Sequence, residues 1–241
     1  MRYHYMIDHR TILAARNNAD WYSMMFDVHG LKYSRSKIAF IAADTPPRFH
    51  SRMVSLDPEA REPLRQIIDE NLHHADFEFK DSFDCLVSHD DNRLKELFSA
   101  SWIHTDTVET ANTKDWIKIA SKADLSTWEH AWKDNNSIPT KKQFPNSILE
   151  RQDVAIWGRR NSNSSDDPIR FDAGVIANTS SDCVGMSNLF GRNAYPAAAT
   201  LCAGIAPSLP VVGHERGQDL VDALDTGFTV TGQLRVWANV A

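Results

Sequence analysis

Two apolar runs separated by a short polar turn constrain the fold of this 241-residue chain more than any other feature. The runs cover residues 170–178 and 182–190, and the stretch 171–176 alternates as a half-buried strand does. Residues 179–181, between the runs, favour turns. The pattern predicts two neighbouring antiparallel strands, so we expect a sheet in the second half of the chain.

Helices and strands are expected along the whole chain, beginning with a helix at 11–28 that ends at Gly30. Further helices are predicted at 59–72, at 92–99, near 144–150, from Pro196 to about Ala206, at 217–226, and from a cap at Asp124 or Ser126. Further strands are predicted at 37–43, 51–56, 76–87, 100–104, 116–120, 153–159, 209–213 and 228–237. The turn formers at 161–168 predict a hairpin loop.

The two halves of the chain differ in composition. Nine of the ten glycines lie between Gly158 and Gly232, whereas nine of the ten histidines lie at or before His130. Because glycine permits close backbone approach, a backbone that contacts a ligand is expected in the second half. Each half nevertheless ends in a strand, a polar turn, a helix and a strand that closes on Trp102 or Trp237. This likeness fits an ancient duplication, or the common similarity of two α+β units.

Charge and hydropathy exclude two classes of partner. The chain has 26 Lys and Arg against 32 Asp and Glu, a net charge of −6, which argues against a non-specific nucleic-acid binder. Its longest apolar stretches fall far short of the roughly 20 residues that span a bilayer, and its N-terminus has no apolar signal core. We expect neither a nucleic-acid nor a membrane partner.

The cysteines indicate a reducing compartment. Cys85, Cys183 and Cys202 are odd in number, far apart and without a CxxC pair, so we expect a cytoplasmic protein with no disulfide framework. His50 and the pair His73-His74 have no metal-ligand spacing, and no metal site is expected.

Two stretches of the second half carry a resemblance to a known family. Residues 171–190 (FDAGVIANTSSDCVGMSNLF) resemble the central hairpin of the GNAT acyltransferase superfamily, and residues 210–237 resemble its closing strand, helix and Gly-Phe turn. The order of the elements expected from 116 to 237 is also the order of that family. Within the superfamily the chain resembles bacterial tandem proteins in which a degenerate GNAT-like half precedes a better-formed one. The residues that support this are Asn17–Ala19, Trp21, His29-Gly30, Pro46-Pro47, Lys80–Phe83, Trp102, Ser187-Asn188 and Leu234–Trp237.

The resemblance implies an α+β fold, with a mixed, mainly antiparallel sheet flanked by helices in two tandem halves. The division implied is a degenerate half at 1–110 and an acyl-CoA-binding half at 111–241. In the family, one strand bulges and separates from the next, and the pantetheine arm of acetyl-CoA or another acyl-CoA pairs with the open backbone. The resemblance places that separation between 170–178 and 183–190, with Gly174, Val175 and Ile176 as the platform.

The pyrophosphate of the cofactor is expected at the next helix, on Gly191, Arg192 and Asn193. The family pattern is Arg/Gln-x-x-Gly-x-Gly/Ala, and this chain departs from it, because Asn193 and Ala194 stand at the second and third small positions. Pro196 also removes one backbone donor.

Three residues are candidates for acid–base catalysis. His214 beside Glu215 at a strand end would act as a general base toward an amine; the alternative is that both are solvated turn residues. Tyr195 would act as a general acid toward a thiolate leaving group, although the family's tyrosine usually lies later in the chain. Cys183 and Cys202 are nucleophile candidates without a nearby signature, and buried inert thiols explain them as well.

The sequence is therefore consistent with two functions. The first is an N-acyltransferase that moves an acetyl or acyl group from acyl-CoA to the amine of a small molecule or peptide. The second is a non-catalytic GNAT-fold binding or interaction module with a decayed phosphate loop. The hairpin favours the first and the loop at 191–196 favours the second. In either case residues 80–82 are expected to line a cleft between the halves, or Asp81 to cap the segment that follows it.

Overall fold

One sheet runs through the computed structural model, which describes residues 7–87, 91–136, 142–161 and 170–240. In chain order, the first seven elements are α1 (His9–His29), β1 (Tyr33–Arg35), β2 (Ala39–Ala42), β3 (Met53–Ser55), α2 (Arg61–Asn71), β4 (Glu78–Asp81) and β5 (Leu94–Thr105). The rest are β6 (Trp116–Lys118), α3 (Lys122–Asn136), the 3-10 helix η1 (Asn146–Glu150), β7 (Val154–Arg160), β8 (Phe171–Thr179), β9 (Val184–Phe190), α4 (Tyr195–Ile205), β10 (Val211–Glu215), α5 (Gly217–Asp225) and β11 (Thr229–Asn239).

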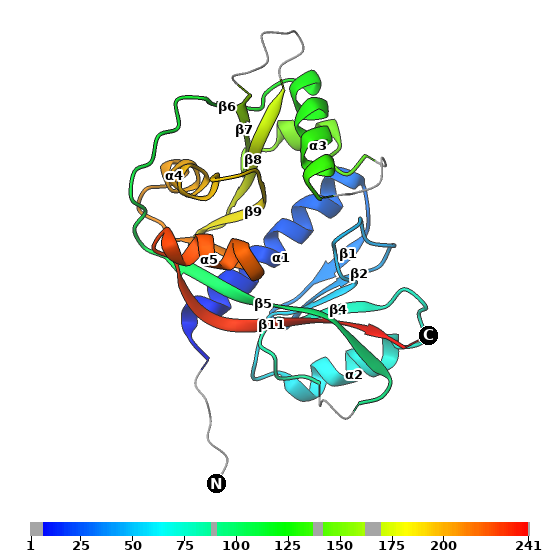
Figure 1. The fold of residues 1–241 in the computed structure, drawn as a ribbon. Helices are drawn as coiled ribbons and strands as arrows, with labels where there is room; N and C mark the ends of the chain where they lie inside the picture. The colour runs from blue at the N-terminus through cyan, green and yellow to red at the C-terminus, as the bar shows by residue number, and fades with distance from the viewer. Residues whose placement is uncertain (1–6, 88–90, 137–141, 162–169, 241) are drawn as a thin grey trace.

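The strands join across the middle of the chain. The order in the sheet is β1-β2-β3-β4-β11-β5-β10-β9-β8-β7-β6 (Figure 1). The final strand β11 lies between β4 and β5, so it pairs with two strands from the first half, and β5 in turn pairs with β10. The expected mixed, mainly antiparallel sheet is confirmed, as is the antiparallel hairpin of β8 and β9. The division at residue 110 remains a prediction.

The parallel pairs occur at corresponding places. β3 and β4 are parallel and joined through α2, and β9 and β10 are parallel and joined through α4. Between them lie the antiparallel strands β11 and β5. This repeated arrangement is what a duplication would leave, and also what two similar α+β units would share.

The helices cover the two faces of the sheet in separate groups. α1 and α3 pack on one face, where they bury Phe26, Trp128 and the side chains of β2, β3 and β7. α4 and α5 pack on the other face against β8, β9 and β10. Figure 1 shows α1 crossing behind β5 while α5 lies in front of it. Any site within the sheet near β9 and β10 is therefore bounded by α1 on one side and α4 on the other.

The predicted helix at 92–99 is wrong, because residues 92 and 93 form a turn and residues 94–99 belong to β5. β5 pairs with β11 from Leu94/Asn239 to His104/Thr229, and this long-range ladder overrides the local helical preference of the segment. The prediction of a strand at 100–104 is confirmed, and the short edge strand β1 was not expected.

Two other boundaries were misplaced for local reasons. Helix α3 begins at Lys122, because Ser121 Oγ accepts a hydrogen bond from Asp124 N at 3.0 Å and donates one to Asp124 Oδ2 at 2.7 Å. The cap is therefore Ser121, and neither Asp124 nor Ser126. The strand predicted at 76–87 ends at Asp81, whose carboxylate accepts the amides of Cys85 at 2.8 Å and Leu86 at 2.7 Å. Most of the loop predicted at 161–168 lies outside the described residues.

Candidate functional site

The parallel strands β9 and β10 separate shortly after they begin. Among the described strand residues they pair at two positions, Val184 with Val211 and Gly185 with Val212. Gly213 follows so closely that a Cβ there would lie 3.0 Å from Met186 O. Beyond this point no ladder joins the described parts of β9 and β10, although β8 and β5 still pair with their outer edges. We call this the β9–β10 opening.

A bulge in β9 accompanies the opening. Between the pairs Ile176/Ser187 and Gly174/Phe190, β8 advances by one intervening residue and β9 by two. Asn188 in this stretch has a φ of 53°, in the left-handed region that asparagine tolerates better than most residues. The extra residue redirects the end of β9 toward the loop that precedes α4.

The expected platform lies one strand away from this opening. No separation occurs between 170–178 and 183–190, because β8 and β9 pair from Thr179/Val184 to Gly174/Phe190. Gly174, Val175 and Ile176 are buried and pair with β7 on their other side. The prediction identified the correct hairpin but placed the opening between its two strands, β8 and β9. The opening lies instead between β9 and β10.

The loop that follows β9 is fixed against β8. Gly191 has a φ of 100°, and a Cβ there would lie 2.4 Å from Asp172 O, so only glycine fits without strain. Arg159 Nε contacts Asp172 Oδ1 at 2.7 Å, and Arg159 Nη2 donates to Arg192 O at 3.1 Å. The predicted phosphate loop is thus anchored at both the glycine and the carbonyl that follows it.

The start of α4 leaves backbone donors without a side-chain partner. Asn193 has a φ of 52°, and the cap residue Ala194 has no side chain able to accept a hydrogen bond. The Arg192 side chain is exposed and has no ion-pair partner in the described part of the chain. Together these residues could bind an anion at the helix N-terminus. Pro196 has no backbone N–H, so the first turn of α4 offers one donor fewer.

His214 lies on the α1 face of the opening. Its ring centroid is 5.3 Å from that of Trp102, and it lines a cavity of about 10 Å³ next to Met186 and Ser187. Asn17, Asn18 and Trp21 from α1 cover this cavity. A space of this size holds about one water molecule, so the cavity is a small polar gap beneath the opening.

Burial lowers the pKa of His214 well below its usual value, and the nearby positive charges of Lys80 and Arg216 lower it further. The imidazole is therefore neutral at physiological pH and able to accept a proton. Lys80 was expected to line a cleft; it is buried, and it contacts Asn18 and Trp102, two residues that line the cavity.

Glu215 lies on the opposite face, which corrects the interpretation of His214 and Glu215 as neighbours in one site. Successive strand residues point to opposite sides of a sheet, so Glu215 does not orient His214. Instead, Tyr195 Oη donates a hydrogen bond to Glu215 Oε1 at 3.3 Å on the α4 face. Burial, and then the charge of Asp219, raise the pKa of Glu215 to about 8, and burial also raises the pKa of Tyr195. At neutral pH this pair holds a proton on the carboxyl.

The cysteines have the properties of buried structural residues. Cys183 and Cys202 are both fully buried. Burial, and then the charge of Asp20, raise the pKa of Cys183 to about 12, and burial also raises the pKa of Cys202. Thiols of this kind are poor nucleophiles at physiological pH.

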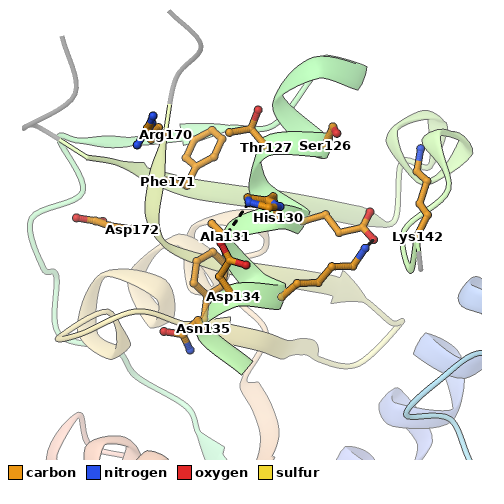
Figure 2. A pocket seen from close by; sticks show the side chains of 13 residues that line it. Ser126, Thr127, His130, Ala131, Asp134, Asn135, Lys142, Arg170, Phe171 and Asp172 are labelled. Carbon is orange, nitrogen blue, oxygen red and sulfur yellow. Dashed lines mark ion pairs between the residues drawn. The ribbon is translucent and has the colours of Figure 1, made fainter. Parts of the chain in front are cut away.

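A wider hollow lies elsewhere, beside α3. It has a volume of about 950 Å³ (Figure 2). Besides Lys142, residues 170–172 and Phe190, it is lined by the α3 residues Ser126, Thr127, Glu129, His130, Ala131, Lys133, Asp134 and Asn135. His130 Nε2 lies 3.3 Å from Asp134 Oδ2 on its wall, and Lys133 Nζ pairs with Glu129 Oε1 at 2.7 Å. Its lining includes Phe190, the last residue of β9, but none of the acid–base candidates predicted from the sequence.

Within the described ranges, no three His, Cys, Asp or Glu side chains are arranged to hold a metal ion. None of the described helices is both long and apolar enough to cross a bilayer.

Comparisons with known proteins rest on structure alone. No family model matches the sequence, and no curated protein matches it significantly. A GCN5-related N-acetyltransferase from Kribbella flavida matches with a TM-score of 0.60 and 10% identity, over 95% of this chain and 96% of that chain. A putative acetyltransferase of the GNAT family from Novosphingobium aromaticivorans matches with a TM-score of 0.51 and 11% identity, over 92% and 96%. N-myristoyltransferase from Saccharomyces cerevisiae with bound myristoyl-CoA matches with a TM-score of 0.51 and 10% identity, over 84% of this chain and 63% of that chain.

Proposed function

Starting from the GNAT fold of this chain, we propose that it is an N-acyltransferase. It moves an acetyl or other acyl group from acyl-CoA to the amine of a small molecule or peptide. The observation that carries this proposal is the β9–β10 opening, which lies directly before the N-terminus of α4. Open strand edges offer N–H and C=O groups to an extended ligand, and a helix N-terminus offers amides to its phosphates.

The cofactor is proposed to bind along β9. The amide groups of its pantetheine arm pair with the open edge of residues 186–190, in place of Gly174, Val175 and Ile176, which belong to β8, the strand that pairs with the other edge of β9. Its pyrophosphate contacts Gly191, Arg192, Asn193 and the first turn of α4. The myristoyl-CoA bound in the yeast structure of similar fold supports acyl-CoA as the ligand class.

The acid and the base lie on opposite sides of the opening. The amine attacks the thioester carbonyl, a C–N bond forms, and His214 takes the proton from nitrogen on the α1 face. The C–S bond then breaks, and the thiolate takes a proton from Tyr195, which is replenished by the protonated Glu215. Both groups return to their starting states by exchange with solvent. Most of the rate enhancement in this scheme comes from holding the amine against the thioester.

A binding module without catalysis is the second candidate, and the loop favours it. Asn193 and Ala194 replace two small positions of the family pattern, and Pro196 gives the first turn of α4 one donor fewer. Such a protein would bind an acyl-CoA weakly and would not transfer the acyl group.

Calorimetric titration of the full chain with acetyl-CoA and with free CoA tests the proposal. Arg192→Ala should weaken binding about 10- to 150-fold, because it removes a charge-assisted phosphate contact of roughly 1.5–3 kcal/mol. Arg16→Ala, which changes an exposed arginine on α1, is the matched control and should bind as the wild type does. No binding of any acyl-CoA to well-folded wild type would contradict the enzyme. Binding without transfer to a panel of amines would favour the binding module.

A further inference from the structure

Lys80 is a buried cation that has no carboxylate partner within ion-pair distance among the described residues. Only 3% of the residue is exposed, and Nζ donates a hydrogen bond to Asn18 Oδ1 at 2.8 Å. The same Nζ lies 5.2 Å from the ring centroid of Tyr22 and 5.9 Å from that of Trp102. These contacts offset part of the desolvation cost, but a buried charge without a counter-ion still costs stability. A buried cation of this kind acts strongly on neighbouring charges, which makes it a candidate for a functional role.

Trp102 connects this cation to His214. The indole is fully buried, and its Nε1 donates to Ser82 O at 2.7 Å, which fixes the plane of the ring. Lys80 lies near this ring, and the ring centroid of His214 is 5.3 Å from it. Asn18, Lys80, Trp102 and His214 therefore form one connected group, which we call the lysine row. It links α1 and β4 of the first half to β10 of the second.

The groups that face His214 include no negative charge among the described residues that pack against it. Lys80 from β4 and Arg216, which caps α5 directly after β10, are the charged groups that act on it, and both are positive. α1 presents Asn17, Asn18 and Trp21 to the same cavity, and β9 presents Met186 and Ser187, all of them neutral. The imidazole thus lies in an environment that opposes its protonation.

We propose that Lys80 is a positioning residue whose fixed charge adds to the burial of His214 in opposing its protonation, so that the first half of the chain tunes the base of the second. This inference rests on the proposed function. After the C–N bond has formed, the attacking nitrogen carries a full positive charge and is strongly acidic, so a weak base is sufficient. A nearby fixed cation also helps His214 to release its proton to solvent after each cycle.

The test is an NMR pH titration of the His214 ring protons in the full chain, assigned by their loss in His214→Gln. Lys80→Met keeps the unbranched shape of the side chain and removes its charge. It should raise the pKa of His214 by about one pH unit, a tenfold change in proton affinity, as expected for one cation acting through the protein interior. Asn18→Asp should raise it in the same direction, because it supplies Lys80 with a counter-ion.

Two controls separate charge from structure. Lys80→Arg keeps the charge and should leave the pKa of His214 low, and Lys118→Met removes an exposed lysine from the edge strand β6 and should change nothing. If His214 titrates at the wild-type pH in both Lys80→Met and Asn18→Asp, the inference is overturned.

The outcome is separable from that of the proposed function. The titration needs no substrate, so it supports or refutes the role of Lys80 even where no acyl transfer is detected. Where transfer occurs, the acidic limb of the kcat/KM profile should move to higher pH in Lys80→Met by the same amount as the pKa of His214. A profile that falls uniformly, with no shift along the pH axis, would indicate a merely structural lysine and would count against the inference.

Discussion

Replacing Gly174 with alanine should lower the free energy of unfolding by about 2–4 kcal/mol. The new Cβ would lie 2.2 Å from Trp128 Nε1 and 2.4 Å from Phe190 Cε1, both in side chains packed in the core. The Trp128 indole would have to move, and its 2.8 Å hydrogen bond to Trp157 O would be lost or distorted. Overpacking of a core costs about 1–3 kcal/mol and a lost buried hydrogen bond about 1 kcal/mol more.

Urea and thermal unfolding measure this loss, with Gly204→Ala as the matched control. No atom outside its own helix neighbourhood lies within 4 Å of a Cβ at Gly204, which is in α4, so alanine there should stabilise by about 0.5–1 kcal/mol. For Gly174→Ala the midpoint should fall by roughly 4–16 °C. If instead the variant unfolds like the wild type and loses only acyl-CoA binding, Gly174 is the cofactor platform that the sequence predicted, and the assignment to β9 fails.

Two more predictions concern titratable groups. Since the pKa of Glu215 is raised to about 8 in the folded state, mainly by burial, wild-type stability should fall as pH rises from about 4.5 to 8, and Glu215→Gln should remove this fall. Thermal unfolding at pH 5 and pH 9 checks it: an equal difference between wild type and variant at both pH values would refute a protonated carboxyl. The pKa of Cys85 and that of Cys183 are raised to about 12, so native protein at pH 8 should react far more slowly with iodoacetamide than unfolded protein. Mass spectrometry follows this reaction, and rapid labelling of Cys183 in the folded chain would contradict its burial.

The parts of the fold that were predictable are those encoded locally. The helix at 11–28 carries its own apolar spacing, and Gly30 ends it with a left-handed φ of 67°. The hairpin of β8 and β9 is equally local, since both strands and their turn lie within 20 residues. In contrast, β5 depends on β11, more than 120 residues away, and nothing in residues 92–99 alone reveals that partner.

The site was predicted less well than the fold for two physical reasons. The strand at 209–213 was expected to end before His214, so His214 and Glu215 were interpreted as neighbours in one site at the strand end, with solvated turn residues as the alternative. Because β10 continues to Glu215, the alternation of a strand separates them to opposite faces. The position of the opening depends on the register of β9 and on the left-handed Asn188, and neither is encoded by periodicity.

The arrangement of the sheet also explains why the first half matters to a site built mainly from the second. β5 pairs with the whole length of β10, from Val211/Thr105 to Glu215/Ser101. β5 therefore holds one side of the opening in place. α1 covers the opposite face with Asn17 and Trp21, and β4 supplies the only buried lysine of the described residues. A half that had lost its own ligand site would still be required, because without it β10 would have an unpaired edge and His214 would be exposed to water. Under the proposed function, the first half would complete the surroundings of the base His214, and this role would not depend on a ligand site of its own.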